Sequence, residues 1–297
     1  MINIEKCPIC QGTDFSAHLT CTDHAVSHET FQINRCTNCE LLITSPRPAD
    51  KDLGRYYLSD NYTSHVTKAR SLLDRTYLLA RSFTLKWKLH LLEKHHSKKK
   101  GLILDFGCGV GEFLREAAKK GWQITGVEPS AIARKNAEPT VSPRIVPSLQ
   151  EIQPNAAKFD VITAWHVIEH VSDLNNTIQT LKQQLKHDGT IFIAVPNHNS
   201  WDARHYKSSW AAYDVPRHLW HFNIKSMTRL LNAHSLSVIN VVPMRLDAFY
   251  VSLLSEKYKS GAIAIKGFAK SLINGLISNR SARKKTEYSS LIYIVKK

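Results

Sequence analysis

The chain has 297 residues, of which 43% are hydrophobic and 22% are charged, and its formal net charge is +15 at pH 7. This balance fits a globular protein with one domain of ordinary size plus a small accessory module, and it argues against an intrinsically disordered chain. Because no run of about 18 consecutive apolar residues occurs, we expect no transmembrane helix.

The first ten residues contain no cationic start followed by an apolar run, so we expect no secretory signal and predict a cytoplasmic location. The positive charge is compatible with nucleic acid, anionic membrane surfaces or phosphorylated substrates as partners. Composition alone favours the simpler interpretation that the protein is basic without a specific anionic partner.

Four of the six cysteines form two Cys-x-x-Cys pairs, Cys7 with Cys10 and Cys36 with Cys39. In a cytosolic chain this pattern indicates metal binding rather than disulfides. Four thiolates suit tetrahedral Zn²⁺, and because such a site has no open position, we expect its role to be structural. A redox role for one pair is the alternative. Other potential ligands inside the loop are weaker candidates: His18, Cys21, His24 and His28.

We therefore expect a zinc ribbon at residues 1–45 and a helical connector at 46–98. Pro46 and Pro48 mark an extended start of the connector, and apolar residues recur near helical spacing between positions 71 and 94. The remaining residues, 99–297, form the third predicted unit, with a long insertion at 247–290.

From position 101 short apolar runs alternate with helical segments, which predicts a parallel sheet covered on both faces. Strands are expected at 102–106, 123–127, 144–146, 159–164, 190–195, 238–242 and 291–295, and helices at 112–120, 131–136, 174–186 and 227–234. Ser172 and Ser226 are the expected helix N-caps, and Asp188 and Gly189 the expected turn before a strand.

A glycine-rich turn follows the first strand of this sheet, with Gly107, Gly109 and Gly111 before a helix. Glycine permits close approach of a ligand, and open α/β sheets bind ligands at the carboxyl ends of their strands. Glu112 stands where the dinucleotide fingerprint needs its third glycine, and an acidic residue there disfavours a pyrophosphate. A cofactor without phosphates fits better.

These segments resemble the motifs of class I S-adenosylmethionine-dependent methyltransferases. The resemblance spans residues 101–242 and is carried by four segments in the family's order: Asp105-x-Gly107-x-Gly109-x-Gly111; Gly126-Val127-Glu128-Pro129-Ser130; Phe159-Asp160-Val161-Ile162 through Trp165-His166-Val167-Ile168-Glu169-His170; and Asp188-Gly189-Thr190-Ile191 followed by Pro196-Asn197. It implies a Rossmann-like, seven-stranded α/β sheet. Similar segments occur in enzymes that methylate sugars and quinone-precursor hydroxyls, and the cysteine pairs resemble the zinc-binding module of some sugar C-methyltransferases.

The resemblance also implies a set of cofactor contacts. The three glycines let the backbone approach the methionine moiety, and Asp105 holds its amino-acid end. Glu128 accepts hydrogen bonds from both ribose hydroxyls, while Trp165 and His166 lie next to the sulfonium. Cys108 and Pro129 complete the expected set. The alternatives are structural, since Gly109 alone can make a turn and Glu128 can cap a helix.

A hydroxyl acceptor also needs a general base. Two pairs of histidines offer one, His166 with His170 and His218 with His221. The second pair lies in a Pro-Arg-His-Leu-x-His-Phe run, which is similar to a run in some bacterial methyltransferases. Our hypothesis is that His218 or His221 deprotonates the acceptor; the alternative is that these histidines pack or cap locally.

The insertion contains one clear amphipathic helix. Its apolar stripe comprises Ile265, Phe268, Ala269, Leu272, Ile273, Leu276 and Ile277, with Lys266 and Lys270 off the stripe. The favoured interpretation is a helix packed on the sheet. The alternative is an interfacial helix or lid at 261–280 that lies on an anionic membrane.

The sequence thus predicts a methyltransferase that uses S-adenosyl-L-methionine and a structural zinc. The expected acceptor is a small molecule, through a hydroxyl of a sugar, lipid-linked or quinone-like compound. One alternative is an RNA methyltransferase that uses the ribbon and the positive charge, although the basic residues are spread out. Another is a non-catalytic scaffold, against which the intact glycine turn and Glu128 argue.

Overall fold

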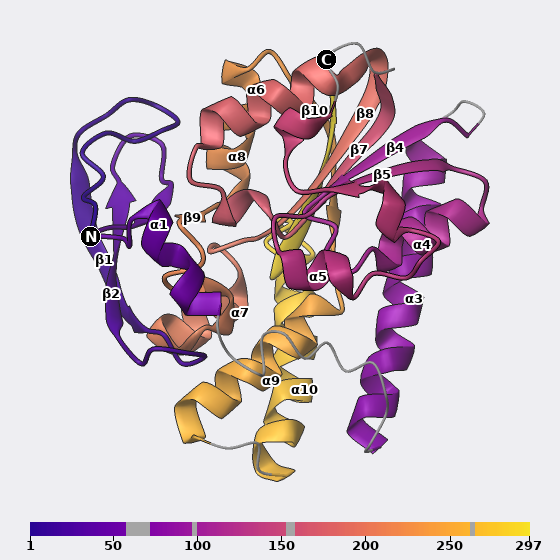
Figure 1. Ribbon diagram of the computed structural model, residues 1–297. Coiled ribbons are helices and arrows are strands. Elements are labelled where there is room, and N and C mark those ends of the chain that lie inside the picture. Colours follow the sequence, from indigo (N-terminus) through magenta and orange to yellow (C-terminus); the bar gives the residue numbers. More distant parts are fainter. Residues whose placement is uncertain (58–71, 97–99, 153–157, 262–264) are drawn as a thin grey trace.

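The computed structural model describes residues 1–57, 72–96, 100–152, 158–261 and 265–297. These residues form an α/β structure with two sheets, in which a small four-stranded sheet flanks a large seven-stranded one (Figure 1). The predicted fold class is therefore confirmed. Part of the predicted connector, residues 58–71 and 97–99, lies outside the described residues.

The large sheet has the strand order β10-β11-β8-β7-β4-β5-β6. Its strands are β4 (Leu102–Phe106), β5 (Gln123–Val127), β6 (Ile145–Val146), β7 (Phe159–Trp165), β8 (Leu185–Pro196), β10 (Ser237–Pro243) and β11 (Ser290–Lys296). The five strands from β8 to β6 are parallel, while β11 runs antiparallel to both β8 and β10. The carboxyl ends of the parallel strands therefore meet along one edge.

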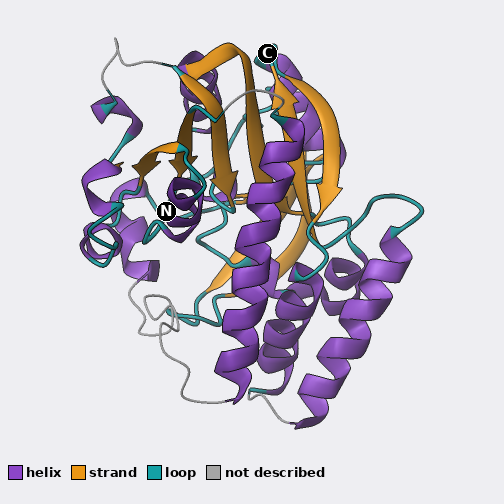
Figure 2. Cartoon of the chain, turned by 90° about the vertical axis from the view of Figure 1, so that its right-hand side faces the viewer, coloured by secondary structure: helices purple, strands orange, loops and turns teal. Residues whose placement is uncertain are grey.

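Helices cover both faces of this sheet (Figure 2). The helices α3 (Leu72–His95) and α4 (Glu112–Lys119) share a hydrophobic core with Ile103 of β4, whereas α6 (Leu174–Gln184) and α8 (Ile224–Ala233) share the opposite core with Leu104. Successive strand residues point to opposite faces, so the neighbouring residues Ile103 and Leu104 of β4 contribute to different cores. The short helix α5 (Ala131–Lys135) follows β5.

The small sheet joins the N-terminal segment to a distant part of the chain. Its order is β1 (Phe15–Thr22), β2 (Thr30–Cys36), β3 (Leu42–Thr44) and β9 (Trp220–His221), all antiparallel. Residues 220–221 thus extend the sheet of residues 15–44. The short helices α1 (Asp50–Leu53) and α7 (Trp201–Tyr206) also belong to this half of the molecule (Figure 1).

Three local expectations were wrong. Asp173, not Ser172, caps α6 by accepting from the amide of Asn176 at 3.1 Å. Asn223, not Ser226, caps α8, and Ser226 occupies the third helical position of a capping box. The segment at Asp188 and Gly189 is an irregular part of β8, which begins at Leu185, rather than a turn before it.

The insertion forms two antiparallel helices, α9 (Asp247–Ser260) and α10 (Ile265–Ala282), that extend beyond the sheet (Figures 1 and 2). The apolar stripe of α10 does not pack on the sheet. The prediction that this helix packs on the sheet was therefore wrong. Small residues face inward instead, namely Ser271, Gly275, Ser278 and Ala282. A Cβ on Gly275 would come within 2.5 Å of the Phe249 ring, which is why the close contact with α9 needs glycine.

The apolar side chains of α10 face outward as a consequence. Leu276 is 62% exposed and Ile273 is 56% exposed. None of the helices in the described ranges is both long enough and apolar enough to cross a membrane, as the sequence predicted.

Candidate active site

The glycine turn lies between β4 and α4 at the carboxyl edge of the sheet. Gly107, Gly109 and Gly111 all have positive φ angles, +73°, +56° and +77°. A Cβ on Gly107 would lie 2.4 Å from Val167, so this glycine is required by packing. A Cβ on Gly109 would meet nothing within 4 Å, so its backbone faces open space. The turn can therefore receive a ligand at Gly109.

Asp105, the fourth residue of β4, lies in the wall of the cavity beside this turn. Its Oδ1 accepts a hydrogen bond of 2.6 Å from the Thr163 hydroxyl. Burial raises the pKa of Asp105 to about 7, against the opposing effects of this hydrogen bond and of the Lys88 charge. A cationic ligand group placed here would favour the carboxylate form.

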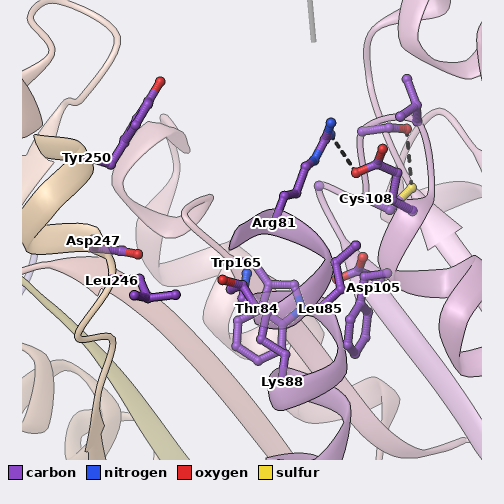
Figure 3. A pocket seen from close by; sticks show the side chains of 15 residues that line it. Arg81, Thr84, Leu85, Lys88, Asp105, Cys108, Trp165, Leu246, Asp247 and Tyr250 are labelled. Carbon is purple, nitrogen blue, oxygen red and sulfur yellow. Dashed lines mark hydrogen bonds and ion pairs between the residues drawn. The ribbon is translucent and has the colours of Figure 1, made fainter. Parts of the chain in front are cut away.

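The cavity has a volume of about 420 Å³ (Figure 3). Asp105, Gly107, Cys108, Gly109 and Trp165, all predicted cofactor contacts, line it. Across from the turn, α3 contributes Arg81, Thr84, Leu85 and Lys88, and the start of α9 contributes Leu246, Asp247 and Tyr250. The cavity is thus enclosed by parts of the chain that lie far apart in the sequence.

The remaining predicted contacts lie beside this cavity rather than in its wall: Gly111, Glu128, Pro129 and His166. The Glu128 carboxylate accepts from the amide of Gly109 at 2.9 Å and from the amide of Ser130 at 2.8 Å. Each carboxylate oxygen has a second lone pair, so these contacts leave Glu128 able to accept further hydrogen bonds. They also fix it next to the turn.

A second cavity, of about 590 Å³, adjoins the first. Thr84, Lys88, Asp247 and Tyr250 line both cavities. We call the second one the histidine cavity, because its wall includes three of the predicted histidines: His166, His170 and His218. Its far side is formed by the N-terminal segment and by α9. The two cavities together form a site with room for two ligands.

His166 lies between two carboxylates. Its Nε2 is 3.1 Å from Asp247 Oδ2, and its Nδ1 is 3.3 Å from Glu169 Oε1. Burial by itself would lower the pKa of His166, but contacts with the two carboxylates outweigh it and raise the pKa to about 9. His166 therefore holds a proton near neutral pH, and its φ of +58° orients it at the end of β7.

His170 and His218 are held differently. Nδ1 of His170 lies 3.1 Å from the Arg217 carbonyl, and Nδ1 of His218 lies 2.9 Å from the Ala212 carbonyl. Because a carbonyl can only accept, each Nδ1 donates, and each Nε2 keeps its lone pair. Burial, reinforced by the neighbouring His218, lowers the pKa of His170 to about 4. The lowered pKa keeps the His170 ring neutral near pH 7.

His221 lies outside the histidine cavity. Its Nε2 is 3.0 Å from the hydroxyl of Thr44, which itself donates to the His218 carbonyl at 2.7 Å. His221 therefore donates to Thr44 and joins β9 to β3, while burial lowers its pKa well below the usual value.

Sequence reasoning missed four charged residues that shape the site: Lys88, Glu169, Asp247 and Arg217. The Lys88 ammonium lies 4.4 Å from the centre of the Trp165 ring. Arg217, with a side chain 1% exposed, pairs with Asp23 at 2.9 Å and with Asp214 at 2.6 Å. Arg217 belongs to the histidine motif, but its partner on the N-terminal segment had no signal in the sequence.

The four predicted metal ligands come together in the N-terminal segment. The sulfur atoms of Cys7, Cys10, Cys36 and Cys39 all lie within 4.8 Å of one another. The Sγ–Sγ distance is 3.4 Å for Cys7 and Cys39 and also for Cys10 and Cys36. With zinc–sulfur bonds of about 2.3 Å, a tetrahedral ion needs such separations. The four-cysteine cluster is confirmed; zinc as its occupant stays a prediction.

A family model described as "Methyltransferase domain" matches residues 75–241, more than half of the chain. Curated relatives include the mitochondrial ubiquinone biosynthesis O-methyltransferase of Homo sapiens, 32% identical over 163 residues (50% of this chain and 44% of the relative). The ubiquinone biosynthesis O-methyltransferase of Actinobacillus pleuropneumoniae serotype 7 is 39% identical over 106 residues (32% of this chain and 45% of the relative). The chain therefore spans less than half the length of these relatives.

Solved structures show the same fold at low sequence identity. Phosphoethanolamine N-methyltransferase 2 of Haemonchus contortus, in complex with S-adenosyl-L-methionine, has a TM-score of 0.50 and 19% identity, covering 71% of this chain and 52% of that one. Geranyl diphosphate C-methyltransferase of Streptomyces coelicolor has a TM-score of 0.50 and 13% identity, with coverage of 77% and 86%. These likenesses concern the fold alone.

Proposed function

This chain belongs to the methyltransferase-domain family, and we propose that it transfers the methyl group of S-adenosylmethionine to a hydroxyl oxygen of a small-molecule acceptor. One observation carries the proposal. The cavity at the glycine turn and the histidine cavity share the wall formed by Lys88, Asp247 and Tyr250, so that two ligands bound in them would meet.

The residues of the first cavity fit the cofactor. Gly109 leaves open space for a close approach, and Asp105 presents a carboxyl to an ammonium group. Glu112, at the first position of α4, pairs with Arg81 at 2.5 Å, so an anionic residue stands where a phosphate would otherwise bind. Glu128 is fixed beside the turn, in position to accept from the ribose hydroxyls.

The cofactor supplies an electrophilic methyl group on a sulfonium. The protein then has to hold the acceptor oxygen in line with that methyl group, which can lower the barrier by about 7–11 kcal/mol. Lys88 lines both cavities, and Trp165, whose ring lies 4.4 Å from the Lys88 ammonium, lines the first one, so both can help to orient the ligands. His218 is our candidate for activating the acceptor hydroxyl, because its Nε2 is free to accept and its ring lines the histidine cavity.

The size of the histidine cavity supports a small molecule. Its volume of about 590 Å³ lies in the range of small-molecule sites, and it is enclosed between α3, α9 and the N-terminal segment. This favours the small-molecule hypothesis over an RNA acceptor. The relatives named for ubiquinone biosynthesis O-methylation favour a quinone-like acceptor among the three predicted classes.

Calorimetry tests the cofactor, with S-adenosylmethionine and S-adenosylhomocysteine titrated into the wild-type chain and into Glu128→Ala. We expect saturable binding by the wild type and a loss of at least about tenfold in the variant, since a charge-assisted hydrogen bond contributes about 1.5–3 kcal/mol. Release of S-adenosylhomocysteine with hydroxylated acceptors then tests transfer. No cofactor binding to folded protein would defeat the proposal.

The assay for release of S-adenosylhomocysteine also distinguishes the roles of His218 and His221. We expect His218→Ala to lower kcat strongly and His221→Ala to act mainly through stability, because His221 lies outside the cavity and donates to Thr44. Turnover at the wild-type level in both variants would eliminate these histidines as the activating group.

Two further proposals concern the surroundings of the site. We propose that Zn²⁺ occupies the four-cysteine cluster in a structural role. We also propose that α10 makes peripheral contact with an anionic membrane, since its outward face is apolar and basic residues border it: Lys266, Lys270, Arg280, Arg283, Lys284 and Lys285. Such contact suits a lipid-linked or quinone-like acceptor. A cytoplasmic location stays a prediction.

A further inference from the structure

We propose that the N-terminal segment completes the acceptor site through two residues of one turn. Asp23 is a positioning residue that acts through Arg217 on His218, and His24 contacts the acceptor from the far side of the histidine cavity. The part of both residues in transfer rests on the proposed function, whereas the coupling of Asp23 to His218 stands on the contacts alone.

Asp23 holds the turn at residues 23–28. Its side chain is fully buried, and its carboxylate accepts hydrogen bonds from the amides of residues 25–27 at 2.8–3.2 Å and from the Ser27 hydroxyl at 2.8 Å. Burial by itself would raise the pKa of Asp23, but hydrogen bonds from Arg217 and Ser27 outweigh it and lower the pKa. Asp23 is therefore a buried carboxylate at neutral pH.

The Arg217 guanidinium joins Asp23 to the loop of residues 214–218. Its Nη2 donates to Asp23 Oδ1 at 2.9 Å and to Asp214 Oδ1 at 2.6 Å, and its Nε donates to Asp214 Oδ2 at 3.0 Å. Its Nη1 donates to the Tyr56 carbonyl at 2.9 Å. Because a planar guanidinium holds its partners in fixed directions, Asp23 determines where Arg217 holds Asp214.

Asp214 in turn holds His218. The Asp214 carbonyl accepts from the His218 amide at 3.0 Å, and Asp214 Oδ2 lies 3.9 Å from His218 Nε2. On the other side of the ring, His218 Nδ1 donates to the Ala212 carbonyl at 2.9 Å. The Asp214 carboxylate thus lies near the nitrogen that we expect to take the proton of the acceptor.

The charge of these residues suits a base. Two carboxylates, Asp23 and Asp214, share one guanidinium, which leaves one negative charge near His218. When His218 Nε2 takes the acceptor proton, the acceptor oxygen bonds to the methyl carbon and the C–S electron pair stays on sulfur. The imidazolium that forms is stabilised by the excess negative charge. Without Asp23, Arg217 would neutralise Asp214 by itself, and this stabilisation would be lost.

The same turn brings His24 to the acceptor. His24 lines the histidine cavity, and its ring stacks on Tyr258 of α9, with centroids 4.4 Å apart and an angle of 16° between the planes. Neither His24 nor Tyr258 lines the cavity at the glycine turn. A ligand that touches this stacked pair is therefore the acceptor and not the cofactor.

Imidazole NMR tests the positioning role in the full chain, prepared with Zn²⁺ and without acceptor. Long-range proton–nitrogen spectra of protein labelled with ¹⁵N-histidine report the tautomer of His218, whose signals are assigned by their loss in His218→Gln. We expect the wild type to show the proton on Nδ1 alone, and Asp23→Asn to lose this single tautomer. His28→Asn, which changes an exposed side chain of the same turn, should keep the wild-type spectrum.

Steady-state kinetics test the consequence, with an acceptor found by the assay for release of S-adenosylhomocysteine. We expect Asp23→Asn to lower kcat by about tenfold or more at an unchanged KM for S-adenosylmethionine, because misplaced reacting groups slow a reaction by up to about 10²-fold. His24→Asn should instead raise the KM for the acceptor by about fivefold, as expected for the loss of one contact. His28→Asn should leave these constants unchanged.

Thermal melting shows which variants fold. If Asp23→Asn does not fold, Arg217→Lys gives the same test, because it keeps the charge but not the planar fork. A folded variant that keeps either the wild-type spectrum of His218 or the wild-type kcat would overturn the positioning role, whatever its melting temperature. An unchanged acceptor KM in His24→Asn would overturn the contact. No transfer by the wild type defeats the proposed function and with it the His24 contact, while the spectra still decide whether Asp23 positions His218.

Discussion

The hydroxyl of Thr44 donates a hydrogen bond of 2.7 Å to the main-chain carbonyl of His218, 174 residues further along the chain. Thr44 is the last residue of β3, which directly follows the four-cysteine cluster, and His218 lies in the wall of the histidine cavity. The pairing of β3 with β9 and the buried pair between Asp23 and Arg217 connect the same two regions. The N-terminal segment thus holds the loop that carries His218.

Loss of zinc should therefore loosen the loop at residues 214–222. We expect one Zn²⁺ per chain by metal analysis, and Cys36→Ser should lose it. Amide hydrogen exchange in the loop should then accelerate by about tenfold or more, which corresponds to about 1.4 kcal/mol of local stability. Cys108→Ala, which removes a cysteine outside the cluster and away from this loop, is the control. Unchanged exchange in Cys36→Ser would show that the ribbon does not support the loop.

Two glycines of the turn should respond differently to the same substitution. Gly107→Ala should destabilise the protein, because the positive φ costs about 1–2 kcal/mol and the new Cβ would clash with Val167. Gly109→Ala meets only the φ cost in the free protein, since its Cβ enters open space, but that space is where we place the cofactor. Melting curves and calorimetry should thus show a larger loss of stability for Gly107→Ala and a loss of affinity in folded Gly109→Ala. Normal cofactor affinity in Gly109→Ala would argue against our placement.

Binding of S-adenosylmethionine should strengthen as the pH rises from 6 to 7.5. Asp105 has a pKa of about 7, so the carboxylate that attracts the ligand ammonium forms over this range. We expect affinity to rise about eightfold, in proportion to the ionised fraction of Asp105, and the rise should vanish in Asp105→Asn. A pH-independent affinity in the wild type would show that Asp105 does not contact the ammonium.

Ionisation of Asp105 strengthens cofactor binding but lowers the stability of the free protein. Its pKa in the folded protein lies above the unfolded value, so the folded state holds the proton more tightly. Without ligand, the contribution of Asp105 to stability is greatest below about pH 4 and declines as the pH rises toward 7. Asp105→Asn should flatten this part of the stability profile.

The outward face of α10 should bind anionic vesicles. We expect the wild type to sediment with vesicles that contain phosphatidylglycerol and to bind less at high salt. Ile273→Gln with Leu276→Gln should weaken binding by about tenfold or more, since each buried aliphatic side chain contributes about 1.5–3 kcal/mol. Ile132→Gln, at an exposed position on α5, is the matched control. If the double variant sediments like the control, α10 does not contact the membrane.

The sequence predicted the large sheet well because its signals are local. Each parallel strand is a short apolar run bounded by turn residues. The glycines at 107, 109 and 111 indicate a turn with positive φ angles. The spacing of the four cysteines likewise predicted the cluster that they form. Contacts such as His166 with Asp247 lack any such signal, because 81 residues separate the partners and nothing in the spacing links them.

The prediction of which face of α10 is buried was wrong for a different reason. Two stripes coexist on this helix, one of large apolar residues and one of small residues at 271, 275, 278 and 282. Hydrophobicity alone selects the first stripe for the core. Close packing against Phe249 of α9 selects the second, and that preference is visible only when the partner helix is known.

The strand pairing between β3 and β9 also limits how the chain can be cut. A fragment that starts after residue 45 would leave the backbone groups of Trp220 and His221 without their neighbouring strand and would uncover the aromatic side chains packed beneath it. An unprotected strand edge recruits other chains. Recombinant fragments without the first 45 residues should therefore aggregate, so boundaries for expression have to retain the ribbon.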